Sequence, residues 1–318
     1  MFVKHDRYLE ARQWIEEFHY PVSGGLPDSG SIGMTIGESR TGKSFTLKRY
    51  LRDFPAVVGE SGLEMPVVYA EMPVDGGVRG ILEELAKSIK LQYSLRMTNP
   101  ALLEAIKTAL VDRNVKLFLI DEIDLVLQED NKRVLNYTRN LLRRLVDLGT
   151  LNVMCVGLEQ SYSLLALDKQ LTGRGGMPYR HMRAYEWESE EERVLFRRLC
   201  DAFDQLLPFN ERSGLARSDV AQRLFWVSDG NIGRLKDIIF FAGCAALNDA
   251  AERVELSHFA AAYERRKPLR TTYNPFVHDL GQAPKAAPGN RNGGPKGRPP
   301  STASLFAKSR SGGDHILA

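Results

Sequence analysis

Apolar residues in the first part of the chain follow two alternating patterns: short continuous runs, and longer stretches with apolar residues three or four positions apart. The short runs are rich in β-branched and aromatic residues, which is typical of buried strands. The longer stretches have the spacing of one helix face. The pattern predicts strands at 32–36, 66–72, 115–120 and 151–156, and helices at 6–18 (with Asp6 as N-cap), 44–54, 78–91, 100–113 and 131–148.

From residue 190 onward the pattern is helical only. Strands that alternate with helices indicate a parallel sheet covered by helices on both faces. We therefore predict an α/β subdomain over 31–188, preceded by an N-terminal helix and loop over 1–30 and followed by a small all-helical lid over 189–268. The lid helices are predicted at 190–206, 219–227, 231–247 and 257–266.

The composition changes after residue 268. Pro and Gly make up 13 of the 48 residues from Thr271 to Ala318. Such a segment buries too little apolar surface to offset its chain entropy, so we predict a disordered basic tail over 269–318. Within it, the sequence Tyr-Asn-Pro-Phe at 273–276 is a candidate docking peptide.

The basic excess of the chain, a formal net charge of +3, is confined to this tail. From Thr271 there are six Lys or Arg against two Asp or Glu, whereas the remaining body has 37 basic and 38 acidic residues. Bulk charge therefore does not indicate a nucleic-acid-binding protein. No apolar run reaches the ~20 residues of a membrane span, and the N-terminus lacks the apolar core of a signal peptide. Three widely spaced cysteines are expected to be buried rather than catalytic or metal-binding, which fits a cytoplasmic protein.

The clearest chemical signal is an octapeptide of the form G-x-x-x-x-G-K-S between the strand at 32–36 and the following helix. Its glycines let backbone N–H groups curl around phosphates, and the helix N-terminus adds a favourable dipole. The lysine reaches the β- and γ-phosphates, and the final hydroxyl binds Mg²⁺. The sequence therefore predicts a site for ATP and Mg²⁺. Its residues are Gly37, Glu38, Ser39, Arg40, Thr41, Gly42, Lys43 and Ser44.

Two adjacent acids end the apolar strand at 115–120. Such a strand brings Asp121 beside the phosphate loop, where its carboxylate can hold Mg²⁺ through water, and Glu122 can act as general base on the attacking water. An acid pair in this place favours hydrolysis of ATP over phosphoryl transfer to a metabolite. A third feature, Gly-Asn-Ile-Gly-Arg-Leu at 230–235, opens a lid helix and makes Arg234 a candidate sensor of the γ-phosphate.

With these pieces in place, the chain resembles the TniB/TnsC family of AAA+ transposition regulators. The resemblance rests on the sequence of the phosphate loop, on Pro-Val-Val-Tyr at 66–69, on Ile-Asp-Glu at 120–122 and on Gly-Asn-Ile-Gly-Arg-Leu at 230–235. It runs from about residue 30 to about residue 265. It implies an AAA+ ATPase that oligomerises on double-stranded DNA as a ring or a helical filament. It also implies a link between target choice and a DDE transposase, with a target-selection protein or CRISPR effector as a further partner.

In this family ATP lies between neighbouring subunits, so the resemblance implies an arginine that acts in trans. Arg174 is the first candidate and Arg180 the second. One departure concerns the strand at 151–156: relatives place a polar residue directly after Val-Gly, and this chain has Leu158 there. Either the polar group is displaced along the chain or hydrolysis is slow.

DNA contacts require Lys or Arg along one surface. Helical spacing puts Lys132, Arg139 and Arg143 on one stripe and Leu135 and Leu142 on another. The candidates on the helices at 78–91 and 131–148 are Lys87, Lys90, Lys132, Arg133, Arg139 and Arg143.

Two other functions stay open from sequence alone. The chain could be a nucleotide-gated adaptor that switches a protein–protein surface without a DNA role, which Leu158 and the near-neutral body favour. A phosphotransferase acting on a small substrate is the third. The regulator is expected to bind DNA and form multimers. The adaptor is expected to form protein complexes that do not depend on DNA, and the phosphotransferase to transfer phosphate to an acceptor other than water.

Overall fold

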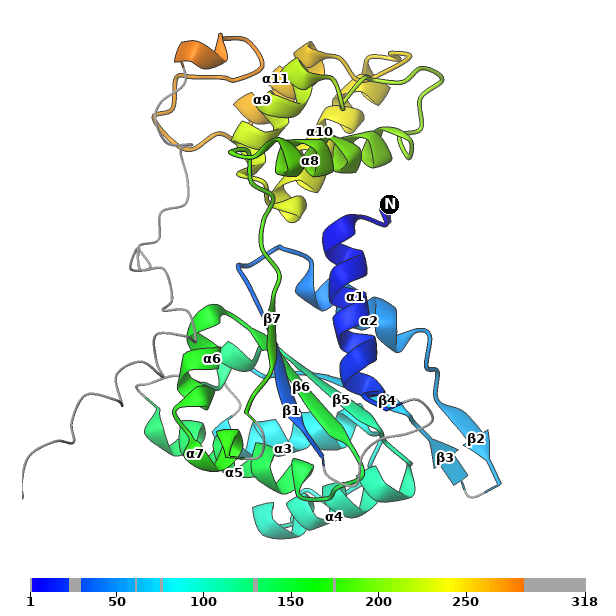
Figure 1. Ribbon diagram of the computed structural model, residues 1–318. Coiled ribbons are helices and arrows are strands. Elements are labelled where there is room, and N and C mark those ends of the chain that lie inside the picture. The colour runs from blue at the N-terminus through cyan, green and yellow to red at the C-terminus, as the bar shows by residue number, and fades with distance from the viewer. Residues whose placement is uncertain are drawn as a thin grey trace, which may run out of the picture.

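The computed structural model has a parallel sheet of five strands in the order β4-β5-β6-β1-β7, with helices on both faces and a helical lid beyond it (Figure 1). This confirms the predicted α/β fold. The strands are β1 (Ile32–Ile36), β4 (Val67–Glu71), β5 (Leu117–Asp121), β6 (Asn152–Gly157) and β7 (Tyr179–His181). The structure describes residues 2–22, 30–60, 62–74, 77–127, 131–173 and 176–282.

The two faces of the sheet bury different helices because successive strand residues point to opposite sides. Leu117 and Leu119 pack with Ile15 of α1 (Asp6–His19) and Leu47 of α2 (Lys43–Leu51). Phe118, between them, packs on the other face. That face is covered by α3 (Gly77–Ser88), α4 (Asn99–Asp112) and α5 (Lys132–Val146).

The lid has its own apolar core. It contains α8 (Glu190–Asp204), α9 (Ser218–Ser228), α10 (Ile232–Asn248) and α11 (Leu256–Glu264). Val3, from the start of the chain, and Phe276, from beyond α11, are also buried in this core. The predicted disordered tail begins too early, at residue 269, because Tyr273, Asn274 and Phe276 are buried against the lid. The predicted docking peptide is thus occupied within its own chain. Residues 283–318 of the predicted tail lie outside the described residues.

Several short elements were not predicted. They are the hairpin β2 (Val57–Gly59) and β3 (Gly62–Glu64), the helices α6 (Glu159–Ala166) and α7 (Lys169–Thr172), and the edge strand β7. At the N-terminus, His5 rather than Asp6 is the N-cap of α1, and its ring accepts from the Tyr8 N–H at 3.3 Å. Among the described residues, no helix is long and apolar enough to cross a membrane.

Candidate nucleotide site

A cavity of about 440 Å³ lies between the sheet and the lid. Its wall combines the phosphate loop, the acids that follow β5, the end of β6, the first residues of the chain and the start of α10. Its lining residues include Phe2, His5, Arg40, Lys43, Ser44, Phe45, Asp121, Glu122, Asp124, Gly157, Leu158, Gly233 and Lys236. The structure thus brings the phosphate loop and the acid pair together at one cavity, although they are 77 to 85 positions apart in the sequence.

The phosphate loop joins β1 to α2. Gly42 is the N-cap of α2 and has φ 99°, a left-handed conformation that a side chain would strain. No side chain caps this helix. Its first backbone N–H groups therefore stay available to an anion, which the helix dipole also favours.

Lys43 is held across the loop. Its ammonium donates to the carbonyl oxygens of Gly37 at 2.7 Å and Glu38 at 2.6 Å. Burial lowers the pKa of Lys43, and the nearby charges of Asp121 and Glu122 act in the opposite direction. A partly desolvated ammonium at this position interacts strongly with phosphate charge because little water screens it.

Asp121 is almost fully buried and fixed in orientation. Its carboxylate accepts from the Glu122 N–H at 2.9 Å and from the Tyr69 hydroxyl at 2.9 Å. Ser44 and Asp121 both line the cavity with oxygen donors, the ligand type that Mg²⁺ prefers. These two residues fit a Mg²⁺ ion, which would neutralise charge on the β- and γ-phosphates when bound.

Glu122 lies directly after β5, next to Asp121. Its φ is 54°, an uncommon left-handed conformation for a residue other than Gly, and it begins the short turn η1 (Ile123–Leu125). Burial raises the pKa of Glu122, and the charges of Asp121 and Asp124 raise it further. A raised pKa makes the carboxylate a better proton acceptor at neutral pH.

The lid is hydrogen-bonded directly to the phosphate loop. The Asn231 amide donates to the Ser39 carbonyl at 2.9 Å, and the Gly233 N–H donates to the Arg40 carbonyl at 3.0 Å. The Arg40 guanidinium also pairs with Asp237. Arg234, the predicted sensor, is half-buried and is not among the residues that line the cavity, whereas Gly233 and Lys236 are.

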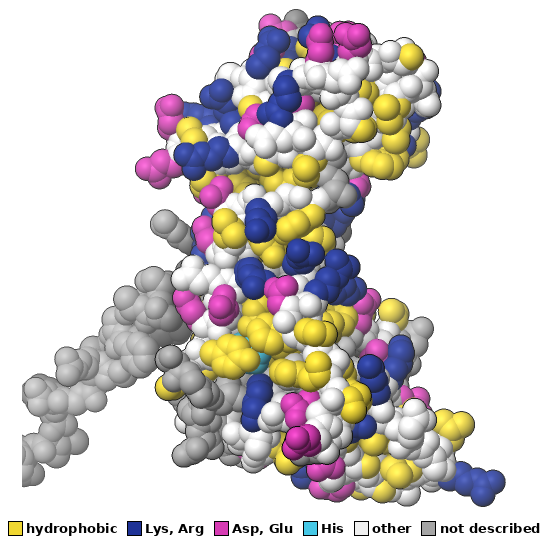
Figure 2. Space-filling model, turned by 90° about the vertical axis from the view of Figure 1, so that its right-hand side faces the viewer, with side chains coloured by type: hydrophobic (Ala, Val, Ile, Leu, Met, Phe, Trp, Pro, Cys, Tyr) yellow, Lys and Arg dark blue, Asp and Glu magenta, His cyan; other side chains and the backbone are white. Residues whose placement is uncertain are grey.

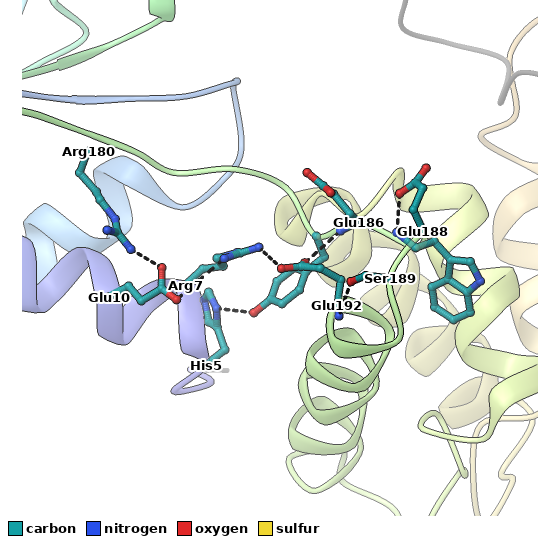
Figure 3. A network of polar contacts seen from close by, with 10 residues as sticks. His5, Arg7, Glu10, Arg180, Glu186, Glu188, Ser189 and Glu192 are labelled. Carbon is teal, nitrogen blue, oxygen red and sulfur yellow. Dashed lines mark hydrogen bonds and ion pairs between the residues drawn. The ribbon is translucent and has the colours of Figure 1, made fainter. Parts of the chain in front are cut away.

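The N-terminal segment connects the α/β subdomain to the lid through polar contacts (Figure 3). Arg7 donates to Glu192 of α8 at 2.6 Å. Tyr185, on the linker to the lid, lies with its hydroxyl 3.1 Å from His5 Nδ1. Burial lowers the pKa of His5 to about 4, so the ring is neutral at pH 7. This contact ties the lid to the residues that line the nucleotide cavity.

The two candidates for an arginine acting in trans differ in what the structure shows. Arg174 lies outside the described residues. Arg180 is on the edge strand β7 and forms an ion pair with Glu10 of α1 at 2.6 Å in the same chain (Figure 3). Its side chain is about half exposed, and the pair would have to open for Arg180 to reach a neighbouring subunit.

Comparison with known families gives this site a context. The family model described as Bacterial TniB protein matches residues 7–187, more than half of the chain. The chain belongs to the TniB family. Among curated proteins, no sequence matches it.

Solved structures similar to this TniB-family chain share its fold at low sequence identity. The Orc1 protein of Aeropyrum pernix in complex with DNA has a TM-score of 0.61 at 16% identity, over 83% of this chain and 66% of its own. The Orc2 protein of the same organism, as ADPNP–ADP complexes, has a TM-score of 0.58 at 16% identity, over 83% and 69%. A Walker-type ATPase of Pyrococcus abyssi has a TM-score of 0.53 at 13% identity, over 82% and 71%. This chain thus has the AAA+ fold and spans about two thirds of the Orc1 chain.

The basic residues predicted to contact DNA in this TniB-family protein differ in exposure, including the three predicted to share a stripe on α5, Lys132, Arg139 and Arg143. Lys132 and Arg133 are exposed at the start of α5, but Arg139 and Arg143 are half-buried. Arg139 donates to the Leu164 carbonyl of α6, and Arg143 donates to the Asn140 side chain within α5 itself. On α3 and just after it, Lys87 is largely exposed beside Glu84, and Lys90 is exposed at φ 57°.

The sequence did not identify several residues that line the cavity. Phe2, His5 and Phe45 come from the segments around α1 and α2, and Lys236 lies two positions beyond Arg234. Helical spacing on the lid could have indicated Lys236, but the N-terminal residues approach the cavity only through tertiary packing.

Gly230 lies between α9 and α10 and contacts Tyr185, in the segment that links β7 to α8, so a substitution there tests how the lid packs against this segment. It has φ 67°, its carbonyl accepts from the Tyr185 N–H at 3.0 Å, and an added Cβ would lie 1.9 Å from the Tyr185 carbonyl oxygen. Gly230→Ala is expected to lower the free energy of unfolding by more than about 2 kcal/mol, because strain and a backbone clash combine. Thermal unfolding of both proteins measures this difference.

Gly80→Ala on α3 is the matched control, since its added Cβ meets only Pro73 at 3.7 Å. It is expected to leave stability unchanged or to raise it by about 0.5–1 kcal/mol. A Tm for Gly230→Ala within about 2 °C of the unmodified protein contradicts the packing described here.

Proposed function

We propose that this TniB-family protein is an ATP-dependent, DNA-binding AAA+ regulator of DNA transposition. The observation that carries the proposal is the cavity itself, which joins a phosphate loop, an acid pair and a lid that is hydrogen-bonded to that loop. Membership of the TniB family agrees with the sequence resemblance, which is what implies the role in transposition. ATP binding at this site changes the contacts that hold the lid, and the lid position then determines how neighbouring copies fit together.

The proposed roles follow from the cavity wall. The loop from Gly37 to Ser44 holds the phosphates, with Lys43 on their negative charge. Ser44 and Asp121 hold Mg²⁺, and Glu122 accepts the proton of the attacking water. Arg234 stays a candidate sensor in cis, and Arg174 or Arg180 a candidate that acts in trans.

The proposed partner is double-stranded DNA, on which copies of the chain assemble as a ring or a helical filament. The Orc1 protein that shares this fold was solved in complex with DNA, and exposed basic side chains are available here on α3 and α5. Figure 2 shows further Lys and Arg side chains on the narrower part of the molecule between the sheet and the lid, on the side that carries α1 and α2. An assembly presents such weak phosphate contacts repeatedly, so that their contributions add up. A DDE transposase, and a target-selection protein or CRISPR effector, would then bind the assembly.

One observation favours a second function, a nucleotide-gated adaptor without a DNA role. Before Thr271 the chain has 37 basic and 38 acidic residues, so the overall charge of this part does not attract DNA. Several basic side chains are also paired within the chain, among them Arg12 with Asp53 and Lys48 with Glu71.

Fluorescence anisotropy of a labelled DNA duplex separates the two functions. We expect binding at least about tenfold tighter with ATP than with ADP, and a steep loss of affinity as salt rises because phosphate contacts release counterions. Lys132→Ala with Arg133→Ala should weaken binding, whereas Lys107→Ala, at a partly buried lysine of α4 that pairs with Glu104, is the control. Equal and negligible binding with every nucleotide at low salt would leave the adaptor function.

A further inference from the structure

The end of β6 presents no polar side chain to the cavity. Gly157 and Leu158 both line the wall at this point, next to the acids that follow β5. Leu158 has no hydrogen-bonding group in its side chain, so it cannot hold a water molecule. Any group that orients the attacking water from this side must come from another element.

Asp124 occupies that place. It lies on η1, three residues after Asp121, and its carboxylate also lines the cavity. One carboxylate oxygen, Oδ1, accepts from the Leu158 N–H at 3.3 Å, and a Cβ on Gly157 would lie 2.8 Å from the same oxygen. The carboxylate of Asp124 therefore fills the space that a side chain at the end of β6 would take.

A second polar group points to the same spot. Ser161 of α6 is fully buried, and its hydroxyl has no hydrogen-bond partner within the described part of the chain. Its Oγ lies 3.3 Å from the position of that Cβ on Gly157. Ser161 lies behind the cavity wall, since it is not among the lining residues. A buried hydroxyl is rarely left without a partner, so a polar group beside Gly157, between Asp124 and Ser161, would satisfy it.

We propose that Asp124 positions the water that attacks the γ-phosphate, in place of a polar side chain at 158. The proposal rests on the ATPase activity proposed above. In that step the water oxygen forms a bond to the γ-phosphorus, and the bond to the β,γ-bridging oxygen breaks with its electron pair kept by ADP. One water proton passes to Glu122, and Asp124 Oδ2 accepts a hydrogen bond from the other.

Asp124 could instead serve only to satisfy the Leu158 N–H. Asp124→Asn separates these roles because the amide oxygen still accepts from that N–H, while the amide nitrogen can only donate. A purely structural residue tolerates this change. A residue that orients the water by accepting a hydrogen bond from it does not.

Steady-state ATP hydrolysis by Asp124→Asn is the test, with and without duplex DNA and with thermal unfolding measured in parallel. We expect kcat to fall at least about tenfold, while KM for ATP, the affinity for ADP and the Tm stay close to those of the unmodified protein. Asp112→Asn, at the exposed end of α4, is the matched control and should leave kcat unchanged.

Two results overturn the proposal and are distinguishable. If the unmodified protein hydrolyses ATP and the kcat of Asp124→Asn is within about twofold of it, Asp124 does not position the water although the ATPase function stands. If the unmodified protein shows no ATP turnover above that of Lys43→Ala, there is no attacking water to position. That result contradicts both the proposed ATPase activity and the role of Asp124.

Discussion

Replacing Lys43 with Ala is expected to lower the affinity for ATP at least about 100-fold, or roughly 3 kcal/mol. Lys43 is the charged group that spans the phosphate loop and donates to the carbonyl oxygens of Gly37 and Glu38. Its ammonium is partly desolvated, so its interaction with phosphate is strong and no other side chain of the loop replaces it. Titration calorimetry with a slowly hydrolysed ATP analogue measures the change.

Lys48→Ala is the matched control for this prediction. Lys48 lies on the same helix, α2, but its side chain is half exposed and pairs with Glu71 at 3.1 Å. Such a surface ion pair contributes little, so ATP affinity should stay within about threefold of the unmodified protein. Equal affinities for Lys43→Ala and Lys48→Ala would show that nucleotide binds somewhere else.

The second large effect is expected for Glu122→Gln. The amide keeps the shape of the side chain but cannot accept a proton, so kcat for ATP hydrolysis should fall at least about 100-fold while ATP still binds. Because Glu122 has a raised pKa through burial and the charges of Asp121 and Asp124, removing its charge also relieves repulsion in the cavity. The variant is therefore expected to hold ATP at least as tightly as the unmodified protein does.

Phosphate release and nucleotide affinity, measured on the same preparation, check this prediction. Glu104→Gln on the exposed surface of α4 is the matched control and should not change either quantity. Turnover by Glu122→Gln within about threefold of the unmodified protein would exclude Glu122 as general base.

Much of the fold could be predicted because its signals are local. The strand β1, the phosphate loop and α2 follow one another without interruption, and the apolar run before Asp121 matches β5 closely. The helices of the lid have strong helical spacing and end within two residues of the predicted limits. Short exposed elements such as β2 and β3 carry no comparable apolar pattern, since all three residues of β2 are exposed.

The candidate site was only partly predictable because much of it depends on tertiary contacts. His5 and Tyr185 are 180 positions apart in the sequence, and no local pattern indicates that they meet. Likewise, nothing in the sequence of β7 shows that Arg180 pairs with Glu10. The predicted stripe on α5 assumed that one helix face is open to solvent, but α6 and α7 pack beside that face, and Arg139 is half-buried there.

Negative-stain electron microscopy of the protein mixed with duplex DNA shows whether ATP drives its assembly on DNA. The mixture would be imaged with ATP, with ADP and without nucleotide, beside Lys43→Ala with ATP. We expect rings or filaments on DNA with ATP only, and none for Lys43→Ala. Assemblies that form equally well in Lys43→Ala, or a protein that binds ATP tightly but never assembles on DNA, would contradict it.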